Sequence, residues 1–246
     1  MSARAALVTG AGSGIGRAVA QRLSDEGFEV LAVDLRPDSD GPGIPHEADL
    51  TDVEANRQAV AAALERFGRL DLVVAGAGIQ HVSPIQEFPV ERWNQIIALM
   101  LTSPFLLAQA AWAALSESDA GSFIAIASAH SLVASPYKAA YVSAKHGVLG
   151  LVRTLALEGA DAGVTATAVC PGYVRTPLVE KQIADQARAH SLSDDEVLEQ
   201  VILEPHAVKT LIEPEQVAEV VAFLAGPAGR VFTGVPVTMD QGWTAR

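Results

Sequence analysis

The sequence predicts an α/β fold, a doubly wound parallel sheet of about seven strands with helices on both faces. Three observations support this prediction. Short apolar runs alternate with amphipathic helical segments from end to end, a glycine-rich turn follows the first run, and 50% of the 246 residues are hydrophobic. Such alternation is typical of βαβ units with right-handed crossovers, whose sheet needs an apolar cover on each side.

In chain order, the apolar runs predict strands at Ala5–Val8, Glu29–Asp34, Leu70–Ala75, Ser122–Ala127, Val164–Cys170 and Val235–Met239. The first helix is expected directly after the glycine turn, because Ile15, Val19 and Leu23 share one face and Gly27 is a stop signal. Further helices are expected at 51–67, 90–117, 135–160 and 214–226.

Local signals refine these elements. Ser135 followed by Pro136 predicts the N-cap and first position of the helix over 135–160. Residues 37–45 hold three prolines and two glycines and are expected to form a loop. The polar segment from Tyr173 to Pro214 breaks the alternation, so we expect short helices there, forming a lid over the site at about 177–210. We expect one domain over 1–246.

The glycine turn, Thr9–Gly16, has the pattern of a dinucleotide-binding loop. Glycines allow the backbone to approach a pyrophosphate, and the following helix N-terminus offers amide donors. Asp34 ends the second strand eighteen residues after Gly16, close to the spacing of a carboxylate that binds the adenosine ribose. The structural alternative is that the glycines serve only a tight turn.

Tyr141 and Lys145 lie four residues apart, so one helix face presents both, and Ser128 precedes Tyr141 by thirteen residues. An ammonium beside a phenol favours the phenolate, so we expect the pKa of Tyr141 to be lowered toward the working pH. Such a tyrosine can take a proton from an alcohol while a hydride leaves the carbon. This pattern is short and is informative only together with the glycine loop.

The composition excludes several classes of function. Asp and Glu number 29 against 17 Lys and Arg, which argues against a nucleic-acid partner. Cys170 is the only cysteine, so no intrachain disulfide can form, and a cytoplasmic location is the simplest interpretation. Cys170 is interpreted as a buried strand residue rather than a nucleophile. No stretch approaches eighteen apolar residues, so we expect no signal peptide and no membrane partner. No metal site is expected either.

Over nearly its whole length the chain resembles the short-chain dehydrogenase/reductase family. The matching features are the Thr9–Gly16 loop, Asp34, Asp49, Ala77–Gly78, the Ser128/Tyr141/Lys145 set, Pro171–Thr176 and Asp240–Gly242. Within the family, Gly78–Val82, Ser128–Lys138, Thr176–Gln182 and Gly242–Ala245 resemble the D-3-hydroxybutyrate dehydrogenases most. The resemblance implies a Rossmann-type sheet, NAD as cofactor and a small-molecule carboxylate as substrate.

The resemblance also implies the roles of individual residues. The catalytic set is Ser128, Tyr141 and Lys145. The cofactor-binding residues are Gly10, Ser13, Gly14, Ile15, Gly16, Asp34, Asp49, Ala75, Gly76, Tyr141, Lys145, Pro171, Val174 and Thr176. The substrate-binding residues are Gln80, Ser128, His130, Lys138, Tyr141 and Gln182. Taken alone, Lys138 fits an ordinary solvated helix lysine equally well. His130 alone would be interpreted as a loop histidine, and Gln182 alone as a surface glutamine.

Three positions depart from the family pattern. Ala75–Gly78 stands where most members have Asn-Asn-Ala-Gly, which puts the order of the cofactor loop in question. Met100 stands where a catalytic asparagine is usual, and its thioether is a poor acceptor for the water that links the lysine to solvent. Tyr173 stands where hydroxybutyrate dehydrogenases commonly have tryptophan.

The predicted function is therefore NAD-dependent, reversible oxidation of a short 3-hydroxy acid, D-3-hydroxybutyrate in particular. Two alternatives stay open: a short-chain reductase of another small keto acid, and a nucleotide-binding regulatory protein with weak turnover because of Met100. The family also implies a homotetramer, in which the helices at 90–117 and 135–160 pack against copies of themselves. The alternative is that their apolar faces only cover the sheet.

Overall fold

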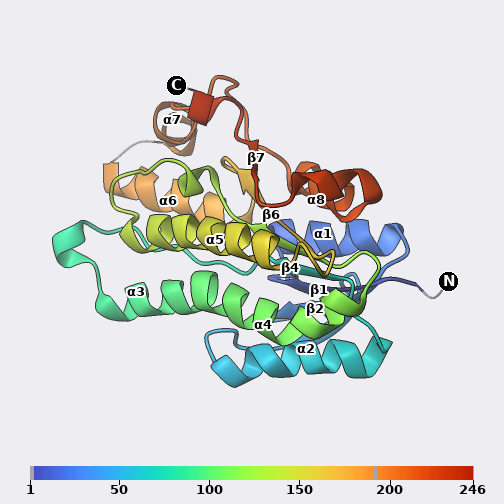
Figure 1. The fold of residues 1–246 in the computed structure, drawn as a ribbon. Coiled ribbons are helices and arrows are strands. Elements are labelled where there is room, and N and C mark those ends of the chain that lie inside the picture. The colour runs from blue at the N-terminus through green and yellow to red at the C-terminus, as the bar shows by residue number, and fades with distance from the viewer. Residues whose placement is uncertain (1–2, 191–192, 246) are drawn as a thin grey trace.

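A seven-stranded parallel sheet forms the centre of the molecule in the computed structural model, which describes residues 3–190 and 193–245 (Figure 1). Its strands, in spatial order, are β3 (Ile44–Glu47), β2 (Glu29–Asp34), β1 (Ala5–Thr9), β4 (Leu72–Ala75), β5 (Ser122–Ile126), β6 (Thr165–Pro171) and β7 (Pro236–Met239). The direction of strand succession reverses between β1 and β4. Doubly wound sheets bind ligands in the crevice at the carboxyl ends of the strands on either side of such a reversal.

Two helical layers cover the sheet. One face carries α2 (Val53–Phe67), α4 (Ser103–Glu117) and α5 (Ala139–Glu158), and the other carries α1 (Gly14–Asp25) and α8 (Pro214–Ala225). Each layer has its own core: Phe123 of β5 and Leu107 of α4 are fully buried in the first, and Val8 of β1 and Val19 of α1 in the second. The predicted fold class is confirmed, including helices on both faces.

The edge strand β3 begins at Ile44, within the last two residues of the segment 37–45 that was expected to be a loop. Prolines suggested a loop over 37–45, yet Pro45 pairs with Ala32 of β2 in parallel register. Because β3 has a neighbour on one side only, a residue without an N–H group is tolerated there. The expectation of a continuous loop over 37–45 is therefore wrong at its end.

The helix that carries Tyr141 and Lys145 begins later than Ser135 and Pro136 indicated. Its N-cap is Lys138, and α5 starts at Ala139. Tyr137 has a φ of 67°, in the left-handed region, which is incompatible with helical continuation from Pro136. The predicted start of the helix is wrong by about one turn, and Lys138 is placed at its entrance.

One helical stretch runs from Val90 to Glu117 as predicted, but it is not uniformly α-helical. Between α3 (Val90–Ile97) and α4, residues Ala98–Thr102 form a π-helical turn, a feature that recurs at functional sites. The stretch is also long and apolar enough, by length and composition, to cross a membrane, with a mean hydropathy of 1.7 over eighteen residues. We expected no apolar stretch of about eighteen residues, and by mean hydropathy this expectation is wrong for this helical stretch. Its buried residues, among them Leu107 and Leu115, pack in the core against the sheet.

Short helices occupy the segment after β6, as the break in the alternation indicated. They are α6 (Pro177–His190), α7 (Asp194–Val197) and a π-helical turn over Leu198–Ile202. Figure 1 shows α6 and α7 beyond the carboxyl ends of the strands, with the C-terminal end of the described chain beside α7. An apolar cluster that includes Val179, Ile183 and Val197 holds these helices together.

Candidate active site

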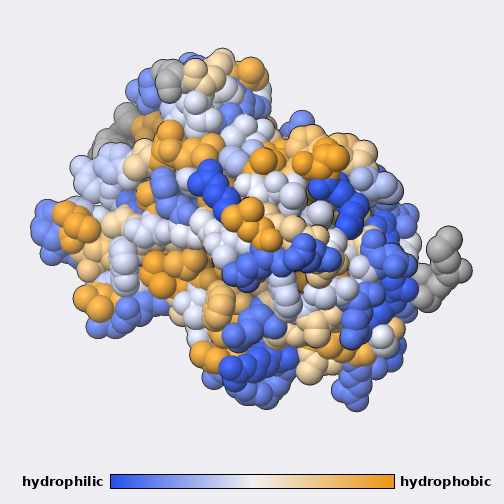
Figure 2. Space-filling model, viewed as in Figure 1, coloured by the Kyte–Doolittle hydropathy of each residue, from blue (hydrophilic) through white to orange (hydrophobic). Residues whose placement is uncertain are grey.

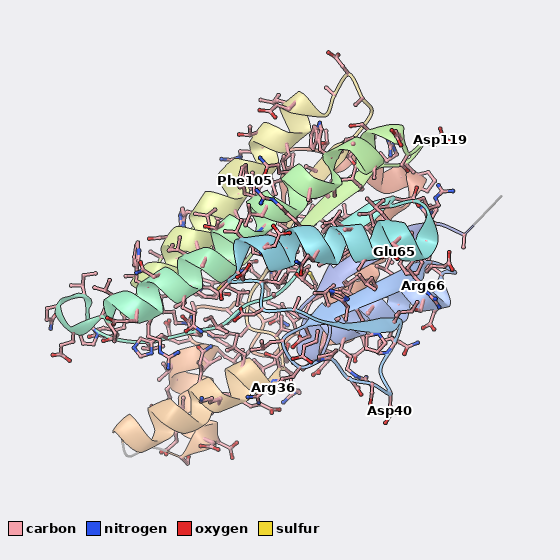
Figure 3. All side chains as sticks on the ribbon, turned by 90° about the horizontal axis from the view of Figure 1, so that it is seen from below. Arg36, Asp40, Glu65, Arg66, Phe105 and Asp119 are labelled. Carbon is pink, nitrogen blue, oxygen red and sulfur yellow. The ribbon has the colours of Figure 1, made fainter. Side chains whose placement is uncertain are left out.

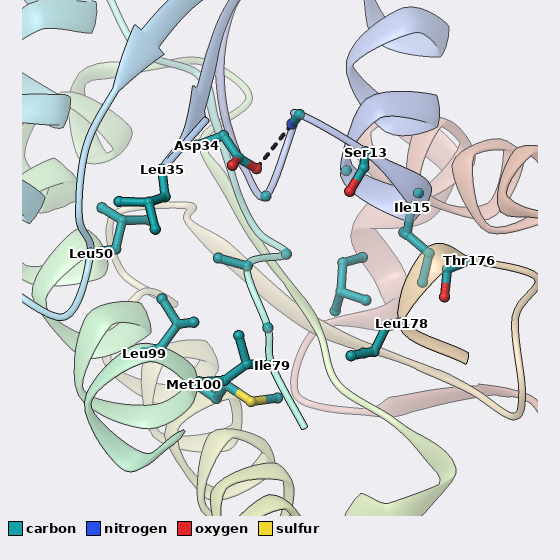
Figure 4. A pocket seen from close by; sticks show the side chains of 18 of the residues that line it. Ser13, Ile15, Asp34, Leu35, Leu50, Ile79, Leu99, Met100, Thr176 and Leu178 are labelled. Atoms are coloured by element: carbon teal, nitrogen blue, oxygen red, sulfur yellow. Dashed lines mark hydrogen bonds between the residues drawn. The ribbon is translucent and has the colours of Figure 1, made fainter. Parts of the chain in front are cut away.

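A cavity of about 570 Å³ lies at the carboxyl ends of the central strands. Figure 4 shows Leu35 and Leu50 on one side of it, with Ser13, Ile15 and Thr176 on the other. The lining includes the predicted residues Gly10, Ser13, Gly14, Ile15, Gly16, Asp34, Asp49, Gly76, Ser128, Tyr141, Lys145, Pro171, Val174 and Thr176. Ala75 does not line the cavity, because it is buried within β4.

The glycine loop is shaped by Asp34, whose two carboxylate oxygens accept hydrogen bonds from the Gly12 amide at 3.0 Å and the Arg36 amide at 2.9 Å. A Cβ on Gly12 would lie 2.6 Å from the Arg36 carbonyl oxygen, so no other residue fits there. Gly14 has a φ of 51°, and a Cβ there would lie 3.0 Å from the Thr176 Cγ2 atom. These clearances leave open backbone beside a helix N-terminus, which fits the pyrophosphate of a nicotinamide dinucleotide.

The altered Ala75–Gly78 stretch is tied to β1 by another side chain. The Thr9 hydroxyl accepts hydrogen bonds from the Gly76 amide at 3.0 Å and the Ala77 amide at 3.2 Å. A Cβ on Gly10 would lie only 2.9 Å from the Ala77 Cα atom, so the two segments are in close contact. Thr9 thus connects the strands that flank the reversal without the usual asparagines.

Ser128, Tyr141 and Lys145 all line this cavity. Burial raises the pKa of Tyr141 to about 12, and a hydrogen bond with Ser128 opposes this rise. The ammonium of Lys145 lies 5.6 Å from the centre of the Tyr141 ring and donates to the Ile126 carbonyl oxygen at 2.6 Å. The expected lowering of the tyrosine pKa is therefore wrong for this structure, because desolvation outweighs every favourable interaction of the phenolate. Burial also lowers the pKa of Lys145 to about 8.

Met100 occupies the π-helical turn beneath Tyr141. It is 2% exposed and packs with Ile96, Ala140 and Ala144, and Tyr141 borders this cluster. Its methyl carbon comes within 3.3 Å of the position that a Cβ on Gly78 would occupy. The region behind Tyr141 is consequently apolar at the position where an asparagine was expected from the family resemblance.

The four residues predicted to surround a carboxylate lie outside the cavity lining and differ in their contacts. Lys138 and His130 are buried, 5% and 3% exposed, and the His130 ring lies edge-on to Tyr141 at 5.7 Å. Burial is the main cause that lowers the pKa of His130 to about 3 and that of Lys138 to about 8. Gln182 in α6 is buried, and its side-chain oxygen has no hydrogen-bond partner among the described residues.

Gln80 lies on the partly exposed segment that follows β4. Its side-chain oxygen accepts a hydrogen bond from the His81 amide at 3.1 Å. The Ser83 amide donates to the Tyr137 carbonyl oxygen at 2.9 Å, so this segment runs beside the entrance of α5 where Lys138 lies.

Aromatic rings connect Tyr141 to Lys138. The Trp243 ring lies 4.9 Å from His130 and is stacked on Tyr173, with ring centres 5.5 Å apart and planes 5° apart. His206 is tilted against both Trp243 and Tyr173. His206 was missed by sequence reasoning, since it is a single histidine in a polar segment and no local pattern marks it. It is 1% exposed, burial lowers its pKa, and within the described residues neither ring nitrogen makes a hydrogen bond.

Comparisons with known proteins agree with this geometry. The family model described as short chain dehydrogenase matches residues 4–187. The chain is 43% identical to the D-beta-hydroxybutyrate dehydrogenase of Rhizobium meliloti over 99% of both chains, and 38% identical to that of Cupriavidus necator over 100% of both. The solved structure of Thermoplasma acidophilum aldohexose dehydrogenase matches with a TM-score of 0.93 at 27% identity, covering 100% of this chain and 95% of that one. The chain therefore belongs to the short-chain dehydrogenase family and is an oxidoreductase that acts on CH–OH groups.

Proposed function

We propose that this oxidoreductase interconverts a short D-3-hydroxy acid, in the first place D-3-hydroxybutyrate, and the corresponding 3-oxo acid with NAD. The observation that carries the proposal is the buried ammonium of Lys138. Within the described residues no carboxylate lies within salt-bridge distance of it, and a buried charge without a counter-charge is costly. A carboxylate substrate supplies the missing counter-charge.

The contacts around Lys138 support a substrate that spans from this lysine to Tyr141. Lys138 contacts Tyr173, Tyr173 stacks on Trp243, Trp243 contacts His130, and His130 contacts Tyr141. These contacts join Lys138 and Tyr141 into one continuous set of packed side chains. The relatives named D-beta-hydroxybutyrate dehydrogenase support the same choice of substrate.

In this proposal Tyr141 accepts the proton of the substrate hydroxyl and Ser128 orients that oxygen. Lys145 stabilises the phenolate and holds the ribose beside it. When bound, the nicotinamide accepts the hydride. Thr176, which borders the cavity beside Gly14, would hold the carboxamide of the bound cofactor. The apolar surroundings of Tyr141 keep water away from the reacting carbon, and α6 with α7 acts as the lid.

Asp34 supports NAD rather than NADP. Its carboxylate stands at the end of β2, where the adenosine ribose would lie, and a 2′-phosphate there meets a repulsion of about 4 kcal/mol per unit-charge pair at ~4 Å and a dielectric near 20. Arg36, which Figure 3 labels on the loop after β2, reduces this repulsion.

We further propose a cytoplasmic homotetramer. Figure 2 shows apolar side chains between hydrophilic ones on the surface, and several large apolar residues of the surrounding helices are exposed. Phe105 of α4 is 45% exposed, Leu157 of α5 is 80% exposed and Phe223 of α8 is 49% exposed. Burial of such side chains against second copies of the chain would stabilise an assembly. Light scattering on the purified protein tests its mass against the 25.7 kDa of one chain.

The function is tested by NADH formation at 340 nm from D-3-hydroxybutyrate and NAD, with the L-enantiomer and NADP as controls. Turnover of the D-acid with NAD is the expected result. Met100 is the observation that favours the second candidate, a nucleotide-binding protein with weak turnover. NADH binding without turnover of any short hydroxy acid would favour that candidate, and loss of turnover in Tyr141→Phe would exclude it.

A further inference from the structure

The side chains of Lys138 and Tyr173 form a polar pair beside the proposed substrate site. The Lys138 ammonium donates a hydrogen bond of 2.8 Å to the Tyr173 phenol oxygen and lies 4.9 Å from the centre of its ring. Since lysine is only a donor, the phenol oxygen is the acceptor, and its own proton points elsewhere. Within the described residues no acceptor lies at hydrogen-bond distance from this proton.

The position of the Tyr173 ring is fixed by its neighbours. Trp243 is stacked on it with planes 5° apart, and His206 is tilted against it by 56° at 5.8 Å. Tyr173 also borders the apolar cluster of the lid helices. A phenol held in this way loses little conformational freedom when it binds a ligand, so its hydrogen bond is pre-organised.

We propose that Tyr173 is a specificity-determining residue whose hydroxyl, anchored on Lys138, donates a second hydrogen bond to the carboxylate of the substrate. This inference rests on the proposed function, in which Lys138 is the counter-charge. Two donors on adjacent atoms, 2.8 Å apart, match the two oxygens of one carboxylate. A neutral amide at the same place would present one acceptor and would leave one donor without a partner.

The ionisation state of the pair agrees with this role. Burial raises the pKa of Tyr173 to about 12, so the phenol keeps its proton at physiological pH and remains a donor. Burial lowers the pKa of Lys138 to about 8, so the ammonium is still charged at neutral pH.

The experiment compares Tyr173→Phe, which keeps the ring and its stacking, with the wild-type enzyme. The Kd of butyrate and of butyramide is measured by calorimetry in the presence of saturating NADH. We expect the Kd of butyrate to rise about tenfold, as for the loss of one hydrogen bond to a charged group, and the Kd of butyramide to change less than twofold. The KM of the hydroxy acid should rise by a similar factor while kcat is preserved. Tyr137→Phe, at an exposed tyrosine next to Lys138, is the matched control and should change neither Kd.

Each outcome decides the inference. An unchanged Kd of butyrate in Tyr173→Phe would overturn it, as would an equal loss of both ligands, which would indicate a packing role alone. Failure of the wild-type enzyme to bind butyrate would overturn it too. Selective loss of butyrate binding in a protein that does not turn over D-3-hydroxybutyrate would support the carboxylate site and reject the proposed substrate.

Discussion

The ammonium group of Lys145 donates a hydrogen bond of 2.6 Å to the carbonyl oxygen of Ile126, the last residue of β5. This contact holds the charge near Tyr141 while burial lowers the pKa of the lysine to about 8 and raises that of the tyrosine to about 12. Oxidation needs the phenolate, so its rate should rise with pH while Lys145 is charged and level off above pH 8.

A substitution of Lys145 distinguishes its contribution to the pH dependence from that of Tyr141. Arginine stays charged throughout this range, so in Lys145→Arg the rate of oxidation should continue to rise above pH 8, even if its maximum is lower. The measurement is the initial rate of NADH formation between pH 6 and 10. A profile that levels off at the same pH in both proteins would show that Lys145 is not the group responsible.

The apolar surroundings of Met100 predict a gain of activity with a loss of stability. Met100→Asn should raise turnover severalfold, because an amide can hold a water behind Lys145, and should cost about 1–3 kcal/mol if the buried amide lacks a partner. Stopped-flow turnover and urea unfolding measure the two effects. Met100→Leu keeps an apolar side chain and should leave turnover as it is. An unchanged or lower rate in Met100→Asn at every pH would contradict the idea that Met100 slows turnover by excluding the water that links Lys145 to solvent.

Cofactor preference should depend on Asp34. Asp34→Asn removes the charge and keeps an oxygen that can accept a hydrogen bond from the Gly12 amide. The ratio of kcat/KM for NADP to kcat/KM for NAD should therefore rise at least tenfold. This change is smaller than the ~4 kcal/mol repulsion of an isolated charge pair would allow. Asp38→Asn, at a partly exposed aspartate paired with Arg17, serves as the control. Equal ratios in the two variants would contradict the assignment.

His130 should make the fold sensitive to mild acid. Burial, with the nearby charges of Lys138 and His146, lowers the pKa of His130 to about 3, whereas in an unfolded chain it is ~6.5. The unfolded state therefore binds a proton that the folded state does not, and the free energy of unfolding falls as pH drops below about 6.5, on the order of 1 kcal/mol per pH unit. Denaturant unfolding between pH 7 and 5 should show a shallower fall in His130→Asn. His146→Asn removes only a minor cause of the lowered His130 pKa and should change the slope less than His130→Asn does.

Thr9 should account for part of the stability at the reversal of the sheet. Thr9→Val leaves the Gly76 and Ala77 amides without their acceptor and should lower the free energy of unfolding by about 1–3 kcal/mol, measured with urea. Thr9→Ser keeps the hydroxyl and should retain most of the free energy of unfolding that Thr9→Val loses. Equal losses in the two variants would indicate that packing rather than hydrogen bonding is at stake.

Much of this fold could be predicted because its strands are buried on both faces and appear as continuous apolar runs. The strand β3 is the exception, since an edge strand tolerates Pro45 and needs no apolar run. The start of α5 could not be predicted from Ser135 and Pro136, because a φ of 67° at Tyr137 depends on the loop that it contacts, through the Ser83 amide.

The residues of the candidate site could be predicted from the sequence better than their pKa values could. The glycine loop and Tyr141 line one cavity as predicted, because spacing along a strand and a helix determines their place. The pKa of Tyr141 depends on desolvation by residues far away in the chain, which spacing does not describe. His206 reaches the Trp243 and Tyr173 rings only through tertiary packing, so no local signal could identify it.

The order of strands has a consequence for how the protein forms during synthesis. Strands β1 to β4 surround the reversal and are complete within the first 75 residues, and β5, β6 and β7 are then added one after another at the same growing edge. The sheet can therefore assemble in the order in which the ribosome produces it. Trp243, which joins His130 to Tyr173, follows β7 in the chain. The strands around the reversal can thus pair before Trp243 joins the rings of His130 and Tyr173.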